Sequence, residues 1–177
     1  MLFRSSDGEG ATRSLVAAVA TVLVWAVALT CIIGVAAAPI VVWLMASGLA
    51  QFDATVLMTR LMFPYIGFMA CVSLAAGVLN TWKRFAVPAA TPVLLNLAVI
   101  GSALALAEPL KARGVEPIYA LCVGVMLGGA LQLLAQLPAL RRIGMLPSVG
   151  LSPSRVRAAW AHPGVSRVLR QMAPAVD

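Results

Sequence analysis

The chain has 177 residues, of which 62% are hydrophobic and only 11% are charged, and its formal net charge is +7 at pH 7. Soluble domains are typically about 45–50% apolar and about 25% charged, and a chain of this length cannot bury so much apolar surface in water. The composition therefore excludes an ordinary soluble domain and predicts an all-α, polytopic transmembrane helix bundle. The cations fall in small clusters between apolar runs, which indicates contact with anionic membrane lipids rather than with nucleic acid.

The first expected span covers residues 14–38, after an N-terminal tail of residues 1–13. Residues 14–52 contain no charged side chain, whereas about 20 helical residues cross a bilayer core of ~30 Å. Pro39 is expected to break the helix. Residues 39–53 then form an extension or loop on the far side of the membrane.

A cleaved signal peptide is the alternative for this first segment, because the three alanines at 36–38 resemble a cleavage site. The apolar part of a signal peptide is only about 7–15 residues long, however, and the leading segment here carries Asp7 and Glu9. A retained membrane span is the better interpretation.

The second expected span covers residues 54–80. Asp53 is placed to cap its first turn, and Arg60 can extend toward the interface. Pro64 removes one backbone donor and should kink the helix near the carbonyl of Arg60. Residues 81–85 then form a short hairpin.

The third expected span covers residues 86–107 and contains two prolines four residues apart. Pro92 cannot donate to the carbonyl of Pro88, so the first turns are expected to be irregular. Asn96 follows four residues later on the same face. Broken helices in transporters often mark moving elements, but helix shaping is the simpler role for these prolines and for Pro64.

The fourth expected span covers residues 118–138, after a loop of residues 108–117. Gly124 and Gly128 have the small-xxx-small spacing that lets another helix approach closely. This pair is therefore expected to mark a helix–helix contact.

Residues 139–177 are more polar. Ser152 followed by Pro153 is a helix start signal. After Pro163, apolar and basic residues alternate between two faces of a helix, which predicts a membrane-surface amphipathic helix or the start of a further span.

The distribution of cations predicts which loops are cytoplasmic. If the loops alternate between the two sides, ten cations fall on one side and three on the other, and by the positive-inside rule the first side is cytoplasmic. The ten are Arg4, Arg13, Lys83, Arg84, Arg141, Arg142, Arg155, Arg157, Arg167 and Arg170. Both ends of the chain are therefore expected in the cytoplasm.

Several strings in the sequence are specific. They are FPY at residues 63–65, LNTWKRFAVP at 79–88, QLPALRRIGMLP at 136–147 and RVLRQMAPA at 167–175. With the sequence around them, from about Ala11 onward, they closely resemble the MurJ/MviN family of lipid II flippases. These are bacterial inner-membrane transporters of the multidrug/oligosaccharidyl-lipid/polysaccharide exporter superfamily.

The resemblance implies a fold of about fourteen helices, with two six-helix lobes around a central cavity and two further helices. This chain would hold helices three to six and the start of seven, and its partners would include the missing helices of the full-length protein. The implied function is to move lipid II, the undecaprenyl-pyrophosphate-linked precursor of peptidoglycan, from the cytoplasmic to the periplasmic leaflet. The fragment alone is expected to be inactive, because it lacks the opposing lobe and the arginines of the first two helices.

The candidate substrate-path residues are cations and amides on or beside the spans. Arg84 could meet the pyrophosphate at the cytoplasmic entrance, or it could simply set topology. Asn80 and Asn96, and the pair Gln132 and Gln136 at i and i+4, are either interhelical hydrogen-bond partners or donors facing the cavity.

A membrane-bound enzyme is the rival class, but it needs acid/base groups or metal ligands near the membrane surface. His162 is the only histidine and no span carries a pair of carboxylates. The three cysteines are far apart without metal-type spacing. No catalytic residue, metal or cofactor is therefore expected. A non-transporting scaffold, or an exporter of another polyprenyl-linked oligosaccharide, remains the alternative.

Overall fold

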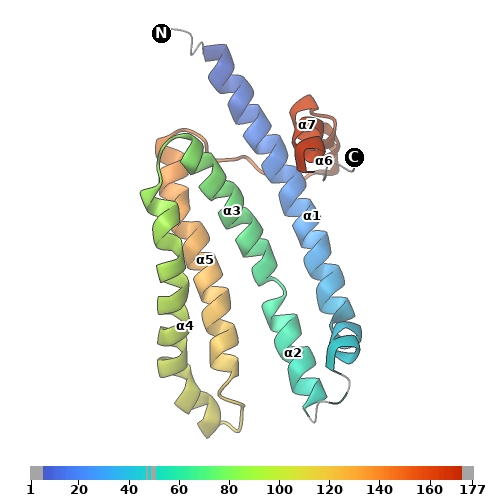
Figure 1. Ribbon diagram of the computed structural model, residues 1–177, viewed down its shortest axis with the longest axis vertical. Coiled ribbons are helices and arrows are strands. Elements are labelled where there is room, and N and C mark those ends of the chain that lie inside the picture. Colours follow the sequence, from blue (N-terminus) through green and yellow to red (C-terminus); the bar gives the residue numbers. More distant parts are fainter. Residues whose placement is uncertain (1–5, 47, 49–50, 173–177) are drawn as a thin grey trace.

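Helices make up the secondary structure of the described part of the chain, residues 6–46, 48 and 51–172 of this computed structural model (Figure 1). Four segments are long and apolar enough to cross a membrane, namely Gly10–Ala46, Phe52–Thr81, Ala86–Ala112 and Tyr119–Arg142. The described residues thus form an all-α bundle with four membrane-length segments. The helices are α1 (Ser6–Ala46), α2 (Phe52–Met62), α3 (Tyr65–Thr81), α4 (Ala86–Ala112), α5 (Tyr119–Arg142), α6 (Pro153–Trp160) and α7 (Pro163–Met172).

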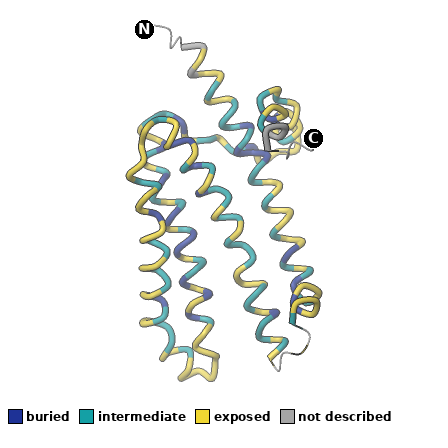
Figure 2. Tube along the Cα trace, viewed as in Figure 1, coloured by how far each residue is buried: buried dark blue, intermediate teal, exposed yellow. Residues whose placement is uncertain are grey.

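The long helices lie in the order α4, α5, α2/α3 and α1. Helix α4 packs along α5, α5 packs along α3, and α1 packs along α2 and α3. The α3–α4 and α5–α6 connections and helices α6 and α7 lie at one end of the bundle (Figure 1). Exposed positions recur along all four long segments (Figure 2), and they include large apolar side chains such as Leu104, which is 81% exposed. Such exposure is favourable in lipid or against further helices.

Helix α1 differs from expectation at both ends. It begins at Ser6, within the residues expected to form a tail, and it continues through Pro39 to Ala46. The expected break at Pro39 is therefore absent. The carbonyl of Val35, which Pro39 leaves without its helical donor, accepts a hydrogen bond from Nε of Arg60 at 3.3 Å, and this bond offsets part of the cost of the proline.

The second membrane-length segment is divided at Pro64, where a kink was expected. Helix α2 ends at Met62 and α3 begins at Tyr65, and the connecting bonds are of the tighter i to i+3 type, from the N–H of Ile66 to the carbonyl of Phe63 and from that of Gly67 to Pro64. The kink is confirmed as a full interruption of the α-helix.

The expected capping of α2 by Asp53 is not observed. The residue before its first turn is Gln51, and no side chain caps the helix there. Asp53 lies inside the first turn instead, where its negative charge interacts favourably with the positive end of the helix dipole.

The prediction of irregular first turns around Pro88 and Pro92 is wrong, because α4 is continuous from Ala86 to Ala112. Pro88 is in the first turn, where no N–H is needed for a helical bond. Pro92 does remove one bond, but the hydroxyl of Thr91 donates to the carbonyl of Pro88 at 2.7 Å. Pro109 is likewise inside the helix, within residues expected to form a loop.

Helices α6 and α7 lie against α1. The backbone of Gly150 is held there from both sides, since its N–H donates to Oγ1 of Thr21 at 3.0 Å and its carbonyl accepts from the indole N–H of Trp25 at 3.0 Å. Ala159 and Val165 form a small core cluster with two residues of α1. This apolar contact and the two hydrogen bonds fix the α5–α6 connection across the first helix.

Candidate functional site between α4 and α5

Two glycines of α5 lie directly against α4. A Cβ atom added to Gly124 would lie 2.7 Å from Cα of Val99, and one added to Gly128 would lie 3.0 Å from Cα of Leu95. Real Cβ atoms essentially never come as close to another atom as 2.7 Å, so position 124 needs glycine for the helices to pack at this separation. At position 128 the added Cβ would require Leu95 to shift. This is the approach that the small-xxx-small spacing describes.

Gln132 extends the same seam by one turn. Its Nε2 donates to the main-chain carbonyl of Thr91 at 2.9 Å, and the side chain is 3% exposed. Gly124, Gly128 and Gln132 on α5 therefore meet Val99, Leu95 and Thr91 on α4 in antiparallel register. The amide joins two helices inside the apolar region, as interhelical hydrogen bonds in membranes do.

Gln136 lies one turn further along α5 and is fully buried, at 0% exposed. Neither of its side-chain amide atoms has a hydrogen-bond partner among the described residues, and Oε1 of Gln132 is also unpaired. A buried polar group without a partner costs about 1–3 kcal/mol. The two glutamines thus form a buried polar stretch in which one amide is bonded and the other is not.

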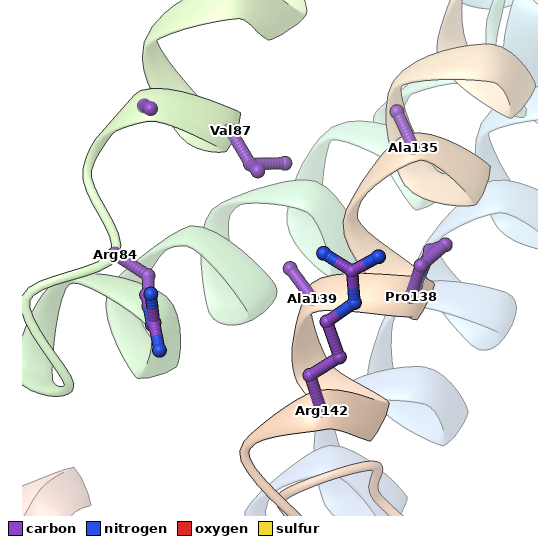
Figure 3. Close-up of a pocket in the computed structure, with 7 residues that line it drawn as sticks. Arg84, Val87, Ala135, Pro138, Ala139 and Arg142 are labelled. Atoms are coloured by element: carbon purple, nitrogen blue, oxygen red, sulfur yellow. The ribbon is translucent and has the colours of Figure 1, made fainter.

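Arg84 lies in the loop before α4, at the rim of a cavity of about 440 Å³ (Figure 3). The cavity is bounded by the start of α4 and the last turns of α5, and Arg142 on α5 is its second cation. The sequence assigned Arg142 only to the cytoplasmic cation count. Arg84 and Arg142 are far apart in the sequence, so the sequence did not predict that they line the same cavity. The antiparallel pairing of α4 and α5 brings them together.

The two asparagines do not join these residues. Asn80, near the end of α3, and Asn96, on α4, are both exposed, and neither side chain takes part in a hydrogen bond within the described segments. The structure therefore assembles Arg84, Gln132 and Gln136 along the α4–α5 pair. Asn80 and Asn96 face lipid, solvent or further helices.

The described residues contain no cluster of three or more histidine, cysteine or acidic side chains that could hold a metal ion. The buried polar side chains of the described residues are two amides, Gln132 and Gln136, and the hydroxyls of Thr21, Thr91 and Ser102, and the charged groups that line the cavity are arginines. The class of protein is therefore a multi-pass α-helical membrane protein with a buried polar stretch and a basic cavity at one end.

Comparison with known proteins identifies the family. The family model described as "Lipid II flippase MurJ" matches residues 2–176, so the chain belongs to the MurJ family. It is 49% identical over 98% of its length to the lipid II flippase MurJ of Burkholderia cenocepacia. It is 32% identical over 98% of its length to the probable lipid II flippase MurJ of Vibrio cholerae. The chain spans 33% of the length of each of these relatives.

Proposed function

We propose that this chain is part of a lipid II flippase, which moves the lipid-linked peptidoglycan precursor from the cytoplasmic to the periplasmic leaflet. The observation that carries the proposal is the family match over residues 2–176, together with relatives that are named for this activity. The location is the bacterial inner membrane. The partners are lipid II, anionic membrane lipids and the remaining helices of the family fold.

The chemistry of the cargo supports transport rather than catalysis. A flippase must hold an anionic, hydrophilic head away from hydrocarbon while the polyprenyl tail stays in lipid, and buried amides and cations suit that task. Two lobes that rock against each other around a central site provide alternating access in such folds. Arg84 is the exposed cation that could reach such a path, whereas Gln132 and Gln136 are buried between the helices of this chain.

Complementation with a chimera tests the function. The corresponding segment of the Burkholderia cenocepacia relative is replaced by this chain, and the chimera is expressed in cells depleted of their own flippase. Rescue of growth is expected, because the chain aligns over 98% of its length with that relative. A chimera that inserts into the membrane at the normal level but does not rescue growth would contradict the proposal. The 177 residues alone are expected not to rescue, since alternating access needs two bodies.

The role of Arg84 is tested in the same chimera with Arg84→Ala. Loss of rescue with normal insertion supports contact with the anionic cargo. Loss that follows from inverted or poor insertion supports the topology role, and normal rescue would exclude an essential contact of Arg84 with the cargo.

The proposed topology places the α3–α4 and α5–α6 connections in the cytoplasm. Both lie at the same end of the bundle in Figure 1, and this end carries Lys83, Arg84, Arg141 and Arg142. The test is cysteine labelling at positions 83 and 113 after replacement of the three native cysteines. Position 83 should react only with reagent that has entered the cell, and position 113 should react from outside. The reverse pattern would overturn the orientation.

A further inference from the structure

The cavity between α4 and α5 has the lining of a site for an amphiphilic anion. Its volume is about 440 Å³, and its lining contains two arginines, no acidic residue and otherwise only apolar side chains. Val87, Ala135 and Pro138 are among the apolar ones, and Figure 3 shows them together with Arg84 and Arg142. A charged head can therefore lie at the arginines while an attached hydrocarbon chain follows the apolar wall.

The start of α4 adds a second source of positive potential. The first N–H groups of a helix have no intrahelical acceptor, and the helix dipole makes this end attractive to anions. Ala86 and Val87 form the first turn and line the cavity, no side chain caps the helix, and the first turn contains no acidic residue. These backbone donors and the two guanidinium groups border the same space.

The main chain at Arg84 and next to Arg142 is fixed by hydrogen bonds of helix C-terminal caps. The N–H of Arg84 donates to the carbonyl of Leu79 at 2.9 Å, which closes the C-terminal cap of α3. Beyond Arg142, the N–H of Met145 donates to the carbonyl of Leu140 at 3.0 Å and closes the equivalent cap of α5. Leu79 and Leu140 belong to one buried cluster. The positions from which the two side chains extend are therefore fixed relative to each other.

From these observations we infer that the cavity binds the phosphate of a membrane lipid, with Arg84 and Arg142 on the phosphate oxygens and the lipid chain along Ala135 and Pro138. Guanidinium groups match phosphate oxygens with paired, charge-assisted hydrogen bonds. The apolar wall favours a lipid over a soluble phosphate. Two lipids carry this chemistry, an anionic phospholipid and a polyprenyl diphosphate. Binding of the polyprenyl diphosphate would rest on the proposed function, because lipid II carries the same group, whereas binding of the phospholipid stands or falls separately from it.

The test measures lipid binding by native mass spectrometry. The protein is held in neutral detergent, and phosphatidylglycerol or undecaprenyl diphosphate is added in separate titrations. The double variant R84Q/R142Q is expected to raise the Kd of at least one lipid by about tenfold or more, the size expected for losing charge-assisted hydrogen bonds. The lipid whose Kd rises identifies the source of the phosphate.

Two further variants separate the cavity from general attraction to basic residues. R157Q/R167Q removes two exposed arginines of α6 and α7 and is expected to change the Kd by less than about twofold. A135L keeps every charge but narrows the apolar part of the cavity, so it should weaken binding of the same lipid. Unchanged binding in R84Q/R142Q, an equal loss in R157Q/R167Q, or unchanged binding in A135L would overturn the inference. Because A135L retains both arginines, it remains informative if R84Q/R142Q does not fold.

Discussion

The side chain of Arg60 donates a hydrogen bond from Nε to the main-chain carbonyl of Val35, 25 residues earlier in the chain. In a regular helix this carbonyl would accept from the N–H of residue 39, but that residue is Pro39. A cation of α2 thus replaces the missing backbone donor of α1. The contact offsets part of the cost of the proline in α1 and links one membrane-length segment to the next.

Replacing Arg60 tests this relationship. Arg60→Met is expected to lower the free energy of unfolding in detergent by about 1 kcal/mol, the net value of a typical hydrogen bond. Pro39→Ala restores the backbone donor, so the same arginine substitution should cost clearly less in that background. Arg113→Met, an exposed cation outside this contact, is the control. Equal costs of Arg60→Met with and without Pro39 would contradict the proposed link.

Gly124 should tolerate no side chain. Gly124→Ala is expected to destabilise the protein by about 1–3 kcal/mol, because the new Cβ would lie against the backbone of Val99 and force α4 and α5 apart. Gly101→Ala is the matched control, since nothing lies within 4 Å of a Cβ added there and alanine favours the helix. Reversible unfolding in detergent measures both. If Gly124→Ala were as stable as Gly101→Ala, or if Gly124→Leu left assembly unchanged, the close-packing role would be wrong.

Lys83 occupies a backbone conformation that normally belongs to glycine. Its φ is +58°, and it lies where glycine stands in the equivalent caps after α4 and α5, at Gly114 and Gly144. Lys83→Gly is therefore expected to raise the free energy of unfolding by about 1 kcal/mol. Lys83→Ala removes the same charge but keeps the strain, so it should give no such gain. Equal stabilities of the two variants would show that charge, and not backbone strain, governs this position.

Gln136 is expected to lower stability in the isolated chain. Gln136→Met keeps a similar volume and removes two buried polar atoms that have no partner among the described residues, so it should raise the free energy of unfolding by about 1 kcal/mol. Gln132→Met should give a smaller gain or a loss, because it also removes the bond to Thr91. If Gln136→Met is stabilising yet abolishes rescue in the chimera, the amide serves transport. A loss of stability would show that Gln136 is already satisfied.

The sequence alone determined the class of protein and the number of membrane-length segments. Runs as apolar as residues 14–52 are stable only in lipid, and a chain in lipid must satisfy its backbone within helices. The sequence alone also determined the kink at Pro64, because the covalent structure of proline removes a backbone donor. The glycine spacing at 124 and 128 indicated a helix contact because it depends only on residue size and helical period.

The effect of the other prolines was decided by position and by tertiary structure. Pro109 and Pro138 also lie inside continuous helices, so a proline does not by itself end a helix. Arg60 and Thr91 supply donors for the carbonyls of Val35 and Pro88, which Pro39 and Pro92 leave free. One of these donors comes from another helix and cannot be inferred from local sequence. The basic cavity also arises only from the tertiary structure, because Arg84 and Arg142 meet through the antiparallel packing of α4 on α5. Sequence periodicity shows which residues share a face, whereas the packing partner of that face depends on the whole bundle.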